Sequence, residues 1–477
     1  MTGADLYTLA PLLILAATPV VVMLAIAFYR DHWATVVLTV IGLVAALISL
    51  LLTGSVGPAE VTGLLILDGY ARFFIGLIIA ATLAVALLSY GFLRGIDDQP
   101  DEYYLLLLLA TLGSAVLAAS KHFTSFFLGL EILSVSLYAL IAYPRRLQNQ
   151  IEASLKYLIL AGASAAFLVF GLALVYAATG TMDFAAAVSA RPATWLAPQV
   201  LFAGWGFILV GIGFKLAVVP FHLWTPDVYE GAPAPVTAYV ATVSKGAMFA
   251  LLLRLFAPAE VHREMPLALV FTLIAIASML FGNLAALLQS NVKRILAYSS
   301  IAHLGYLLVA FLASGERAVV AVAFYLTAYF VTMLGALGIV TVFSSHEKEA
   351  DQIEDYRGLF WRRPWLAAVL TVALLSLAGI PLTVGFVGKF YLLMAGVGAT
   401  LWALVFFLVV SSAIGLFYYL RVIVALYMQP PADAPIPEFP PVSLSAGAAI
   451  AVVTVLLIWL GIYPDPVIAM IEAMVRL

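Results

Sequence analysis

Apolar stretches long enough to cross a membrane follow one another along this sequence from end to end. A helix needs about 20 mostly apolar residues to span the hydrocarbon, where the backbone must satisfy its own hydrogen bonds. Hydrophobic residues make up 65% of the chain and charged residues 10%. Soluble domains contain about 45–50% apolar and about 25% charged residues. The sequence therefore predicts an all-α polytopic membrane protein.

Fourteen stretches qualify as transmembrane helices. They lie near residues 6–29, 33–53, 72–93, 103–120, 122–142, 153–178, 200–224, 232–256, 266–289, 292–313, 317–344, 365–394, 400–428 and 444–463. Only Lys121 and His122 separate the fourth from the fifth. The first stretch lacks a basic start and exceeds the apolar core of a cleavable signal, which spans about 7–15 residues. We therefore expect it to be a membrane span.

Lysine and arginine residues in the connections predict the orientation, because cytoplasmic loops are enriched in them. With the N-terminus outside, twelve of these residues fall inside and seven outside. The pairs at 145–146 and 362–363 carry most of this difference. Both termini are therefore predicted to lie outside.

Four charged residues lie well within the apolar part of predicted spans: Lys215, Lys245, Lys389 and Glu131. A charge at bilayer depth costs at least about 2.5–3.5 kcal/mol, so such residues are functional candidates by default. A single lysine of this kind is equally well explained by a long side chain that reaches the headgroups. Three lysines and a glutamate together are not, and we interpret them as an ion path.

Two of the lysine-bearing spans also contain a proline, Pro220 in the seventh and Pro381 in the twelfth. Proline removes a helical hydrogen bond, so we expect both helices to be discontinuous. Spans four to eight and nine to thirteen form two sets of five, and an odd number of spans inverts the second set. Matching interruptions in two halves indicate an inverted repeat with a site at the midplane. Prolines that merely kink packed helices are the alternative.

This reading divides the chain into four parts. Residues 1–102 hold three helices, 103–256 the first five-helix repeat, 257–428 the second, inverted repeat, and 429–477 a proline-rich connector and the last helix. The charged segment at 344–364 is predicted to form a short surface helix.

The buried charges suit proton transfer. A lysine in apolar surroundings releases its proton more readily, because a low dielectric disfavours the charge, and a neighbouring carboxylate opposes this. Lys215 beside Glu131 would form a coupled pair that acts as a switch when it is pulled apart. Lys245 would then pass the proton sideways, and Lys389 would exchange it with the far side.

Histidines and cofactor motifs add little else. His222 and His303 are candidate relays, since histidine titrates near neutral pH, although a hydrogen-bonded structural histidine is the alternative for each. There is no cysteine for iron–sulfur or thiolate metal sites, no phosphate-binding glycine loop and no HExxH. We therefore expect no cofactor and no metal in this chain. The net charge of −3 gives no argument for nucleic acid.

Several segments closely resemble the antiporter-like membrane subunits of respiratory complex I. They are GFKLAVVPFHLWTPDVYEGAPAPVTAYVATVSK at 213–245, NVKRILAYSSIAHLGYLL at 291–308, LSLAGIPLTVGFVGKFYLL at 375–393 and LEILSVSLYAL at 130–140. The resemblance covers nearly the whole chain. Within this family the TPDVYEGAPAPV run and the lysine at 389 are most similar to subunit N of bacterial NADH–quinone oxidoreductase, since subunit M is expected to have a glutamate there.

The resemblance implies fourteen helices with two inverted repeats and a proton half-channel in each. Glu131, Lys215, Lys245 and Lys389 match the family's principal charged residues, and Lys156 falls at its sixth-helix lysine position. The implied location is the bacterial inner membrane, with both termini on the periplasmic side. The implied partners are the paralogous antiporter-like subunits and small membrane subunits, while NADH, FMN, iron–sulfur clusters and quinone would bind to other subunits.

Three other readings remain open. The chain could be a subunit of a cation/proton antiporter, which shares the same ancestry. It could belong to a membrane hydrogenase or a deazaflavin dehydrogenase with a similar subunit. It could also be a passive scaffold whose buried charges no longer carry protons.

Overall fold

The computed structural model describes residues 3–55, 57–94, 100–143, 148–190, 197–256, 266–344, 349–429 and 441–474. In these ranges thirteen helices are long and apolar enough to cross a membrane. They are α2 (Ala10–Phe28), α3 (His32–Leu52), α4 (Gly69–Leu93), α5 (Asp101–Ala119), α6 (Phe123–Ile141), α7 (Gln148–Thr179), α9 (Ala197–Leu216), the stretch Ala234–Phe256, α14 (Leu267–Leu287), α15 (Val292–Ala313), α16 (Glu316–Phe343), α20 (Trp402–Tyr427) and α21 (Leu444–Ile462). Two shorter apolar helices, α18 (Pro364–Ala378) and α19 (Val384–Gly398), occupy the predicted twelfth span. The expected all-α membrane fold is confirmed.

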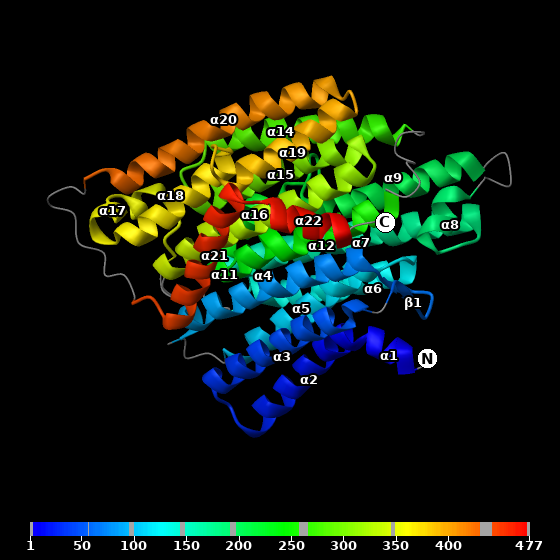
Figure 1. The fold of residues 1–477 in the computed structure, drawn as a ribbon, viewed down its shortest axis with the longest axis horizontal. Coiled ribbons are helices and arrows are strands. Elements are labelled where there is room, and N and C mark those ends of the chain that lie inside the picture. The colour runs from blue at the N-terminus through cyan, green and yellow to red at the C-terminus, as the bar shows by residue number, and fades with distance from the viewer. Residues whose placement is uncertain are drawn as a thin grey trace.

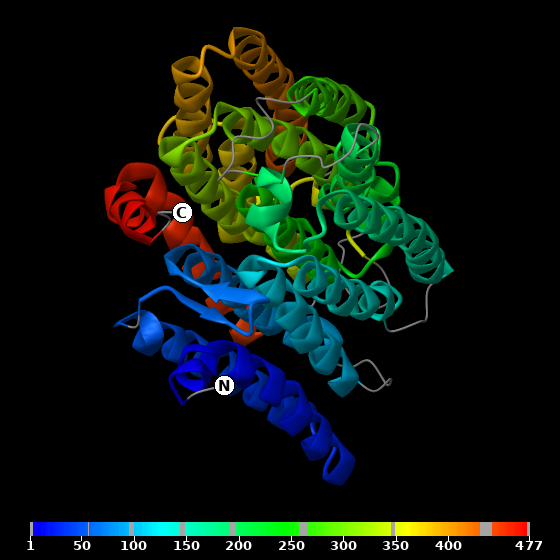
Figure 2. The ribbon, with the colours of Figure 1, turned by 90° about the vertical axis from the view of Figure 1, so that its right-hand side faces the viewer.

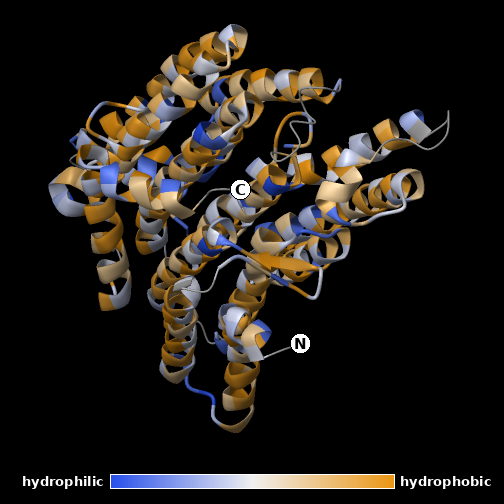
Figure 3. Ribbon diagram, turned by 45° about the vertical axis from the view of Figure 1, so that its right-hand side comes forward, coloured by the Kyte–Doolittle hydropathy of each residue, from blue (hydrophilic) through white to orange (hydrophobic). Residues whose placement is uncertain are grey.

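The long helices lie side by side in one bundle, with α2 and α3 on one flank and α20 on the other (Figure 1). A quarter turn away, the N-terminal helices form a layer beside those of the second half (Figure 2). The core lies around Ala234–Phe256, α15 and α16, whose most apolar windows are 100%, 94% and 94% buried, against 33% for α3 and α20. The outer helices expose apolar side chains such as Phe28, Ile41 and Phe417, and hydrophobic residues predominate along all the long helices (Figure 3). A bundle whose core and outer surface are both apolar is suited to a lipid environment.

Two helices are interrupted where the prolines predicted a break. The helix α9 ends at Leu216, and α10 (Trp224–Gly231) begins after a seven-residue turn that contains Pro220. The helix α18 ends at Ala378, and α19 begins at Val384 after the turn with Pro381. The residues that follow α9 and α18, Ala217 (φ 59°) and Gly379 (φ 84°), are both left-handed. This C-terminal conformation satisfies late carbonyls of each helix, and the expectation of two discontinuous helices is confirmed.

The two sets of five helices pack in the same pattern. α5 packs on α6 as α14 packs on α15. α7 packs on both halves of its broken neighbour, α9 and α10, as α16 packs on α18 and α19. This pattern agrees with the repeat read from the sequence, whereas the exact division at residues 102, 256 and 428 stays a prediction.

The eighth span is not a regular α-helix throughout. It consists of α11 (Ala234–Tyr239), a π-helical turn η2 (Val240–Ser244) and α12 (Lys245–Phe256). A π-helical turn inside a helix often marks a functional position. Here it directly precedes the central lysine.

Several short elements were not predicted. The strands β1 (Ala59–Val61) and β2 (Leu65–Leu67) form a hairpin whose turn holds Thr62 (φ 59°) and Gly63 (φ 69°). The remaining short elements are α1 (Gly3–Thr8), η1 (Thr53–Ser55), α8 (Phe184–Ser189) and α22 (Asp465–Met474). In place of the predicted surface helix there are η4 (Ile353–Tyr356) and α17 (Leu359–Arg362). Residues 345–348 of that segment and 430–440 of the proline-rich connector lie outside the described residues.

Lys121 ties the hairpin to the turn between α5 and α6. Its Nζ lies 2.9 Å from Glu60 of the hairpin and 3.4 Å from Asp183, the residue before α8. Partial burial disfavours the ammonium, but the hydrogen bond to Glu60 and the charge of Asp183 outweigh it and raise the pKa of Lys121. Lys121 is therefore a surface cation, unlike the lysines of the core.

Candidate functional site

Lys215 lies at the first helix break. It occupies the last turn of α9 and its side chain is buried. Its Nζ donates to Ser134 Oγ of α6 and to the Tyr157 hydroxyl of α7, each at 2.8 Å. An amine held by two hydroxyls at the end of a helix is placed to gain or lose a proton without losing its partners.

Glu131 lies on α6, one helical turn before Ser134, on the same face. Its charge and that of Lys215 are close enough to interact. No ion pair joins the two side chains, and Glu131 Oε1 has no hydrogen-bond partner among the described residues. Glu131 and Lys215 are therefore neighbours without a direct contact, and the expected coupling between them stays a prediction.

Lys245 begins α12 and is 1% exposed. Its Nζ donates to Ser300 Oγ of α15 at 2.6 Å. Ser300 Oγ also lies 2.7 Å from the Tyr329 hydroxyl and 3.3 Å from the Tyr229 hydroxyl. A serine hydroxyl accepts two hydrogen bonds and donates one, so three neighbours cannot all donate to it at once. In at least one of these three contacts Ser300 is therefore the donor.

His303 lies one turn after Ser300 on α15 and is buried. Its Nδ1 lies 2.8 Å from the Tyr325 hydroxyl and its Nε2 lies 3.3 Å from the Tyr419 hydroxyl. The charges of Lys245 and Lys389 both act on it. A neutral imidazole donates at one nitrogen and accepts at the other, so the two tyrosine hydroxyls play opposite roles toward His303.

Lys389 lies beside the second helix break, in the second turn of α19. Its Nζ donates to the carbonyl oxygens of Leu377 and Ala378 at 2.8 and 2.9 Å and to Ser412 Oγ at 2.8 Å. These carbonyls are the last two of α18 and have no following turn to accept from. The side chain therefore both caps α18 and places a third amine inside the bundle.

The two remaining candidate relays lie elsewhere. Lys156 is 44% exposed in its side chain and lies 2.8 Å from both Glu152 and Asp227, so it is at the surface end of α7. His222 lies in the turn after α9, where its ring packs 4.5 Å from Phe281. Neither ring nitrogen of His222 has a hydrogen-bond partner among the described residues. The structure thus groups Lys245, His303 and Lys389, but not these two, along α15.

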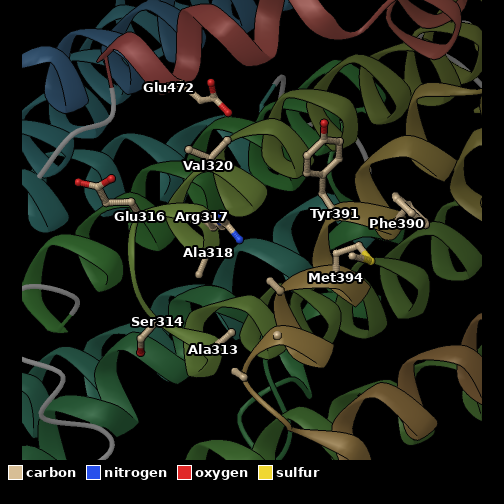
Figure 4. A pocket seen from close by; sticks show the side chains of 13 residues that line it. Ala313, Ser314, Glu316, Arg317, Ala318, Val320, Phe390, Tyr391, Met394 and Glu472 are labelled. Atoms are coloured by element: carbon tan, nitrogen blue, oxygen red, sulfur yellow. The ribbon is translucent and has the colours of Figure 1, made fainter.

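A cavity of about 830 Å³ opens at the end of the bundle beyond Lys389. It lies between the start of α16, the second half of α19 and α22, with Arg317, Tyr391 and Glu472 among its polar lining residues (Figure 4). Tyr391 is two residues after Lys389 along α19. None of the three buried lysines is among the described residues that line it.

The hydrogen-bond partners of the buried lysines and of His303 were not predicted from the sequence. These are Ser134, Tyr157, Ser300, Tyr329, Tyr325 and Ser412. Nor was a buried ion pair, in which Arg254 at the end of α12 binds Asp68 before α4 at 2.8 and 2.9 Å. Among the described residues, no group of three or more His, Asp or Glu side chains is arranged to hold a metal ion.

Comparison with known proteins supports one family. Residues 120–415, more than half of the chain, match the family NADH:quinone oxidoreductase/Mrp antiporter, TM. A chain of respiratory complex I from Thermus thermophilus, solved with bound aureothin, is 35% identical, with 96% of this chain and 98% of that chain covered and a TM-score of 0.83.

Two further solved structures share the fold. A chain of the membrane-bound sulfane sulfur reductase, an archaeal respiratory membrane complex, is 26% identical, with 99% of this chain and 97% of that chain covered and a TM-score of 0.82. A chain of the Mrp complex from Dietzia has a TM-score of 0.85 over 99% of this chain and 97% of that chain, at 21% identity. This chain is a multi-pass membrane protein and belongs to the family of antiporter-like transmembrane subunits that NADH:quinone oxidoreductase and Mrp antiporters share.

Proposed function

We propose that this chain moves protons across the membrane as an antiporter-like subunit in the membrane arm of an NADH–quinone oxidoreductase. The observation that carries the proposal is the nature of the partners of Lys215, Lys245 and Lys389. Each of these three amines is held by hydroxyl or carbonyl oxygens and none by a carboxylate. Neutral partners stabilise an ammonium less than a carboxylate does, so each amine exchanges its proton at a smaller cost.

In this proposal the proton moves in steps from Lys215 through Lys245 and His303 to Lys389. An ammonium at Lys215 gives its proton toward Lys245, and Ser300 turns its hydroxyl as Lys245 becomes charged. His303 takes a proton at one nitrogen while it releases another at the opposite nitrogen, and Lys389 receives it. Because charges on neighbouring sites repel one another in a low dielectric, occupation of one site favours release from the next.

Glu131 acts on the first step. A carboxylate that approaches Lys215 stabilises the ammonium, and one that withdraws releases it. The observed arrangement, with Glu131 near Lys215 but not bonded to it, corresponds to the withdrawn position. Movement of Glu131 would therefore load the site.

The finer identity is also part of the proposal. The TPDVYEGAPAPV run and Lys389 favour the subunit N type, and the 35% identity to a chain of a respiratory complex I supports such a complex. The other membrane subunits would pack beside this chain in a bacterial inner membrane, with both termini on the periplasmic side. NADH, FMN, iron–sulfur clusters and quinone would bind to partner subunits and not here.

The test is a pair of lysine variants in the assembled complex. We expect Lys245→Met to abolish most NADH-driven proton uptake into membrane vesicles at normal complex content. The control Lys121→Met removes a surface lysine and should leave pumping unchanged. Normal pumping by Lys245→Met would refute the proton path.

A cation/proton antiporter subunit is the second candidate. The fold match to an Mrp chain, with a TM-score of 0.85, favours it. Identification of the co-purifying subunits decides between the two: flavin and iron–sulfur proteins support the oxidoreductase, and sodium-dependent transport without them supports the antiporter. Hydrogenase or deazaflavin-dehydrogenase subunits in the same preparation would indicate a related complex.

A further inference from the structure

A network of ion pairs lies at the surface where α10 meets α15. Arg294 Nη1 is 2.9 Å from Asp227 Oδ1 and 2.7 Å from Glu230 Oε2. Asp227 also accepts from Lys156 of α7, and Glu230 from Asn291, the N-cap of α15. One guanidinium therefore holds both carboxylates of α10, which are three residues apart on one face of that helix.

Two aromatic residues of α10 contact the surroundings of two buried lysines. Trp224 packs 4.9 Å from the Tyr157 ring, whose hydroxyl binds Lys215. The ring of Tyr229 lies 5.2 Å from Lys245 Nζ. One short helix thus connects the first lysine site, the central lysine site and the surface network.

A second anchor fixes the end of α10. Lys293 Nζ donates to the carbonyl of Ala232, the residue after α10, at 2.8 Å and also binds Glu349. Glu349 in turn accepts from the backbone N–H of Ala234, the first residue of α11. The first turn of α15 therefore holds both the face and the end of α10.

The position of α10 depends on such contacts. It has eight residues, lies between the turn at Pro220 and the start of α11, and is too short to be stable alone. Arg294 and Ser300 are six residues apart on α15, about 9 Å along the helix axis. Because α15 is one continuous helix, it relates the surface network rigidly to the partner of Lys245.

We propose that Asp227, Glu230 and Arg294 are positioning residues that align α10, and with it Trp224 and Tyr229, between Lys215 and Lys245. This inference rests on the proposed proton path. It names the residues that fix the position of α10, and so of the surroundings of Lys215 and Lys245, for the first proton transfer. The Arg294 side chain is 24% exposed and those of Asp227 and Glu230 are 34% and 36% exposed. Exposed pairs contribute little to stability, so their loss should affect proton transfer more than folding.

Charge reversal in the assembled complex provides the test. Arg294→Glu places a third carboxylate beside Asp227 and Glu230, and we expect the protons moved per NADH oxidised to fall at least threefold at unchanged complex content. Adding Glu230→Arg restores an opposite charge and should recover most of the ratio. The control Arg30→Glu reverses the charge of another ion-paired arginine, which binds Glu102 of α5, and should leave the ratio unchanged.

Each outcome decides the inference. A normal ratio in Arg294→Glu, or no recovery when Glu230→Arg is added, overturns it. Loss of the chain from the complex in Arg294→Glu together with failure of Arg294→Lys to recover the ratio also overturns it, because the network would then serve folding alone. Lys215→Ala, measured alongside, separates the two proposals: normal pumping there refutes the proton path itself, whereas impaired pumping there with a normal Arg294→Glu refutes only the role of the network.

Discussion

Replacement of Arg254 by methionine tests the ion pair that joins the N-terminal helices to the helix of Lys245. The guanidinium binds both Asp68 oxygens, at 2.9 and 2.8 Å, and the two side chains are only 7% and 11% exposed. The Tyr70 ring lies 4.6 Å from the guanidinium carbon, and its hydroxyl donates to the Ala250 carbonyl of α12 at 2.6 Å. Three contacts therefore fix α4 to α12.

The size of the effect follows from burial. Removal of one partner from a buried ion pair costs about 3–5 kcal/mol, because the other charge stays buried without compensation. Loss of the cation from the Tyr70 ring adds about 0.5–2 kcal/mol. We expect Arg254→Met to lower the free energy of unfolding by the sum, about 3.5–7 kcal/mol, measured by denaturant titration of the chain in detergent micelles.

A double variant distinguishes the cost of a stranded carboxylate from the loss of packing around Arg254. Asp68→Asn removes the stranded charge while it keeps the side-chain cap on the Ala71 N–H of α4. Arg254→Met with Asp68→Asn should therefore be more stable than Arg254→Met alone. Arg30→Met, which breaks the exposed pair with Glu102, should cost at most about 1 kcal/mol. A loss below about 1 kcal/mol in Arg254→Met, or a double variant no better than the single, would mean that the nearby charge of Arg72 compensates the Asp68 carboxylate and would refute the reasoning from a stranded charge.

Lys215→Ala should lower proton pumping and NADH oxidation together at normal complex content, and Lys215→Arg should restore little, because a guanidinium does not cycle its proton; normal pumping in verified mutant complex would contradict this. Glu131→Gln combined with Lys215→Ala should impair the pumping rate less than the sum of the two single effects, since the residues interact, and strict additivity in this double-mutant cycle would count against a pair. Lys389→Met should reduce proton pumping at least tenfold. It should also destabilise the second helix break by about 1–3 kcal/mol, because the Leu377 carbonyl loses its hydrogen-bond donor. An unchanged proton-to-NADH ratio would exclude Lys389 from the path.

The buried lysines and the helix breaks could be predicted from the sequence, because charges and prolines are costly inside the hydrocarbon of a membrane. A lysine in an apolar stretch is conspicuous, so Lys215, Lys245 and Lys389 were found by hydropathy alone, and all three are buried. Proline removes a backbone hydrogen bond from a helix interior, and Pro220 and Pro381 marked both breaks, although α2 continues through Pro19. Whether these lysines carry protons remains a prediction.

The partners could not be predicted because hydroxyls give no signal in a span. Ser134 also donates to the Leu130 carbonyl of its own helix, as serines in apolar helices commonly do. Nothing in the sequence distinguishes it from a serine without a lysine partner. The surface network is equally hidden, since Asp227 and Arg294 are 67 positions apart and meet only through tertiary packing.

The residues at which the broken helices end were not predicted, because one of them has an unusual backbone conformation for its residue type. The left-handed residue after α9 is Ala217, although glycine is the usual residue in that conformation, and Gly379 takes the equivalent place after α18. Tertiary contacts therefore override local preference at the first break. An alanine with φ 59° costs about 1–2 kcal/mol, which is tolerated where the surroundings determine the backbone.

The placement of two lysines at helix ends balances opposing influences on their charge. Lys215 lies in the last turn of α9, and Lys389 binds the last carbonyls of α18, so each amine is at the negative end of a helix dipole. The dipole favours the ammonium, whereas the apolar bundle around it favours the neutral amine. A dipole acts over only about one turn, so a small shift of a half-helix changes this balance while the rest of the bundle stays packed. A continuous helix would offer no such end within the bundle, so under the proposed function the breaks, and not the lysines alone, would make proton release adjustable.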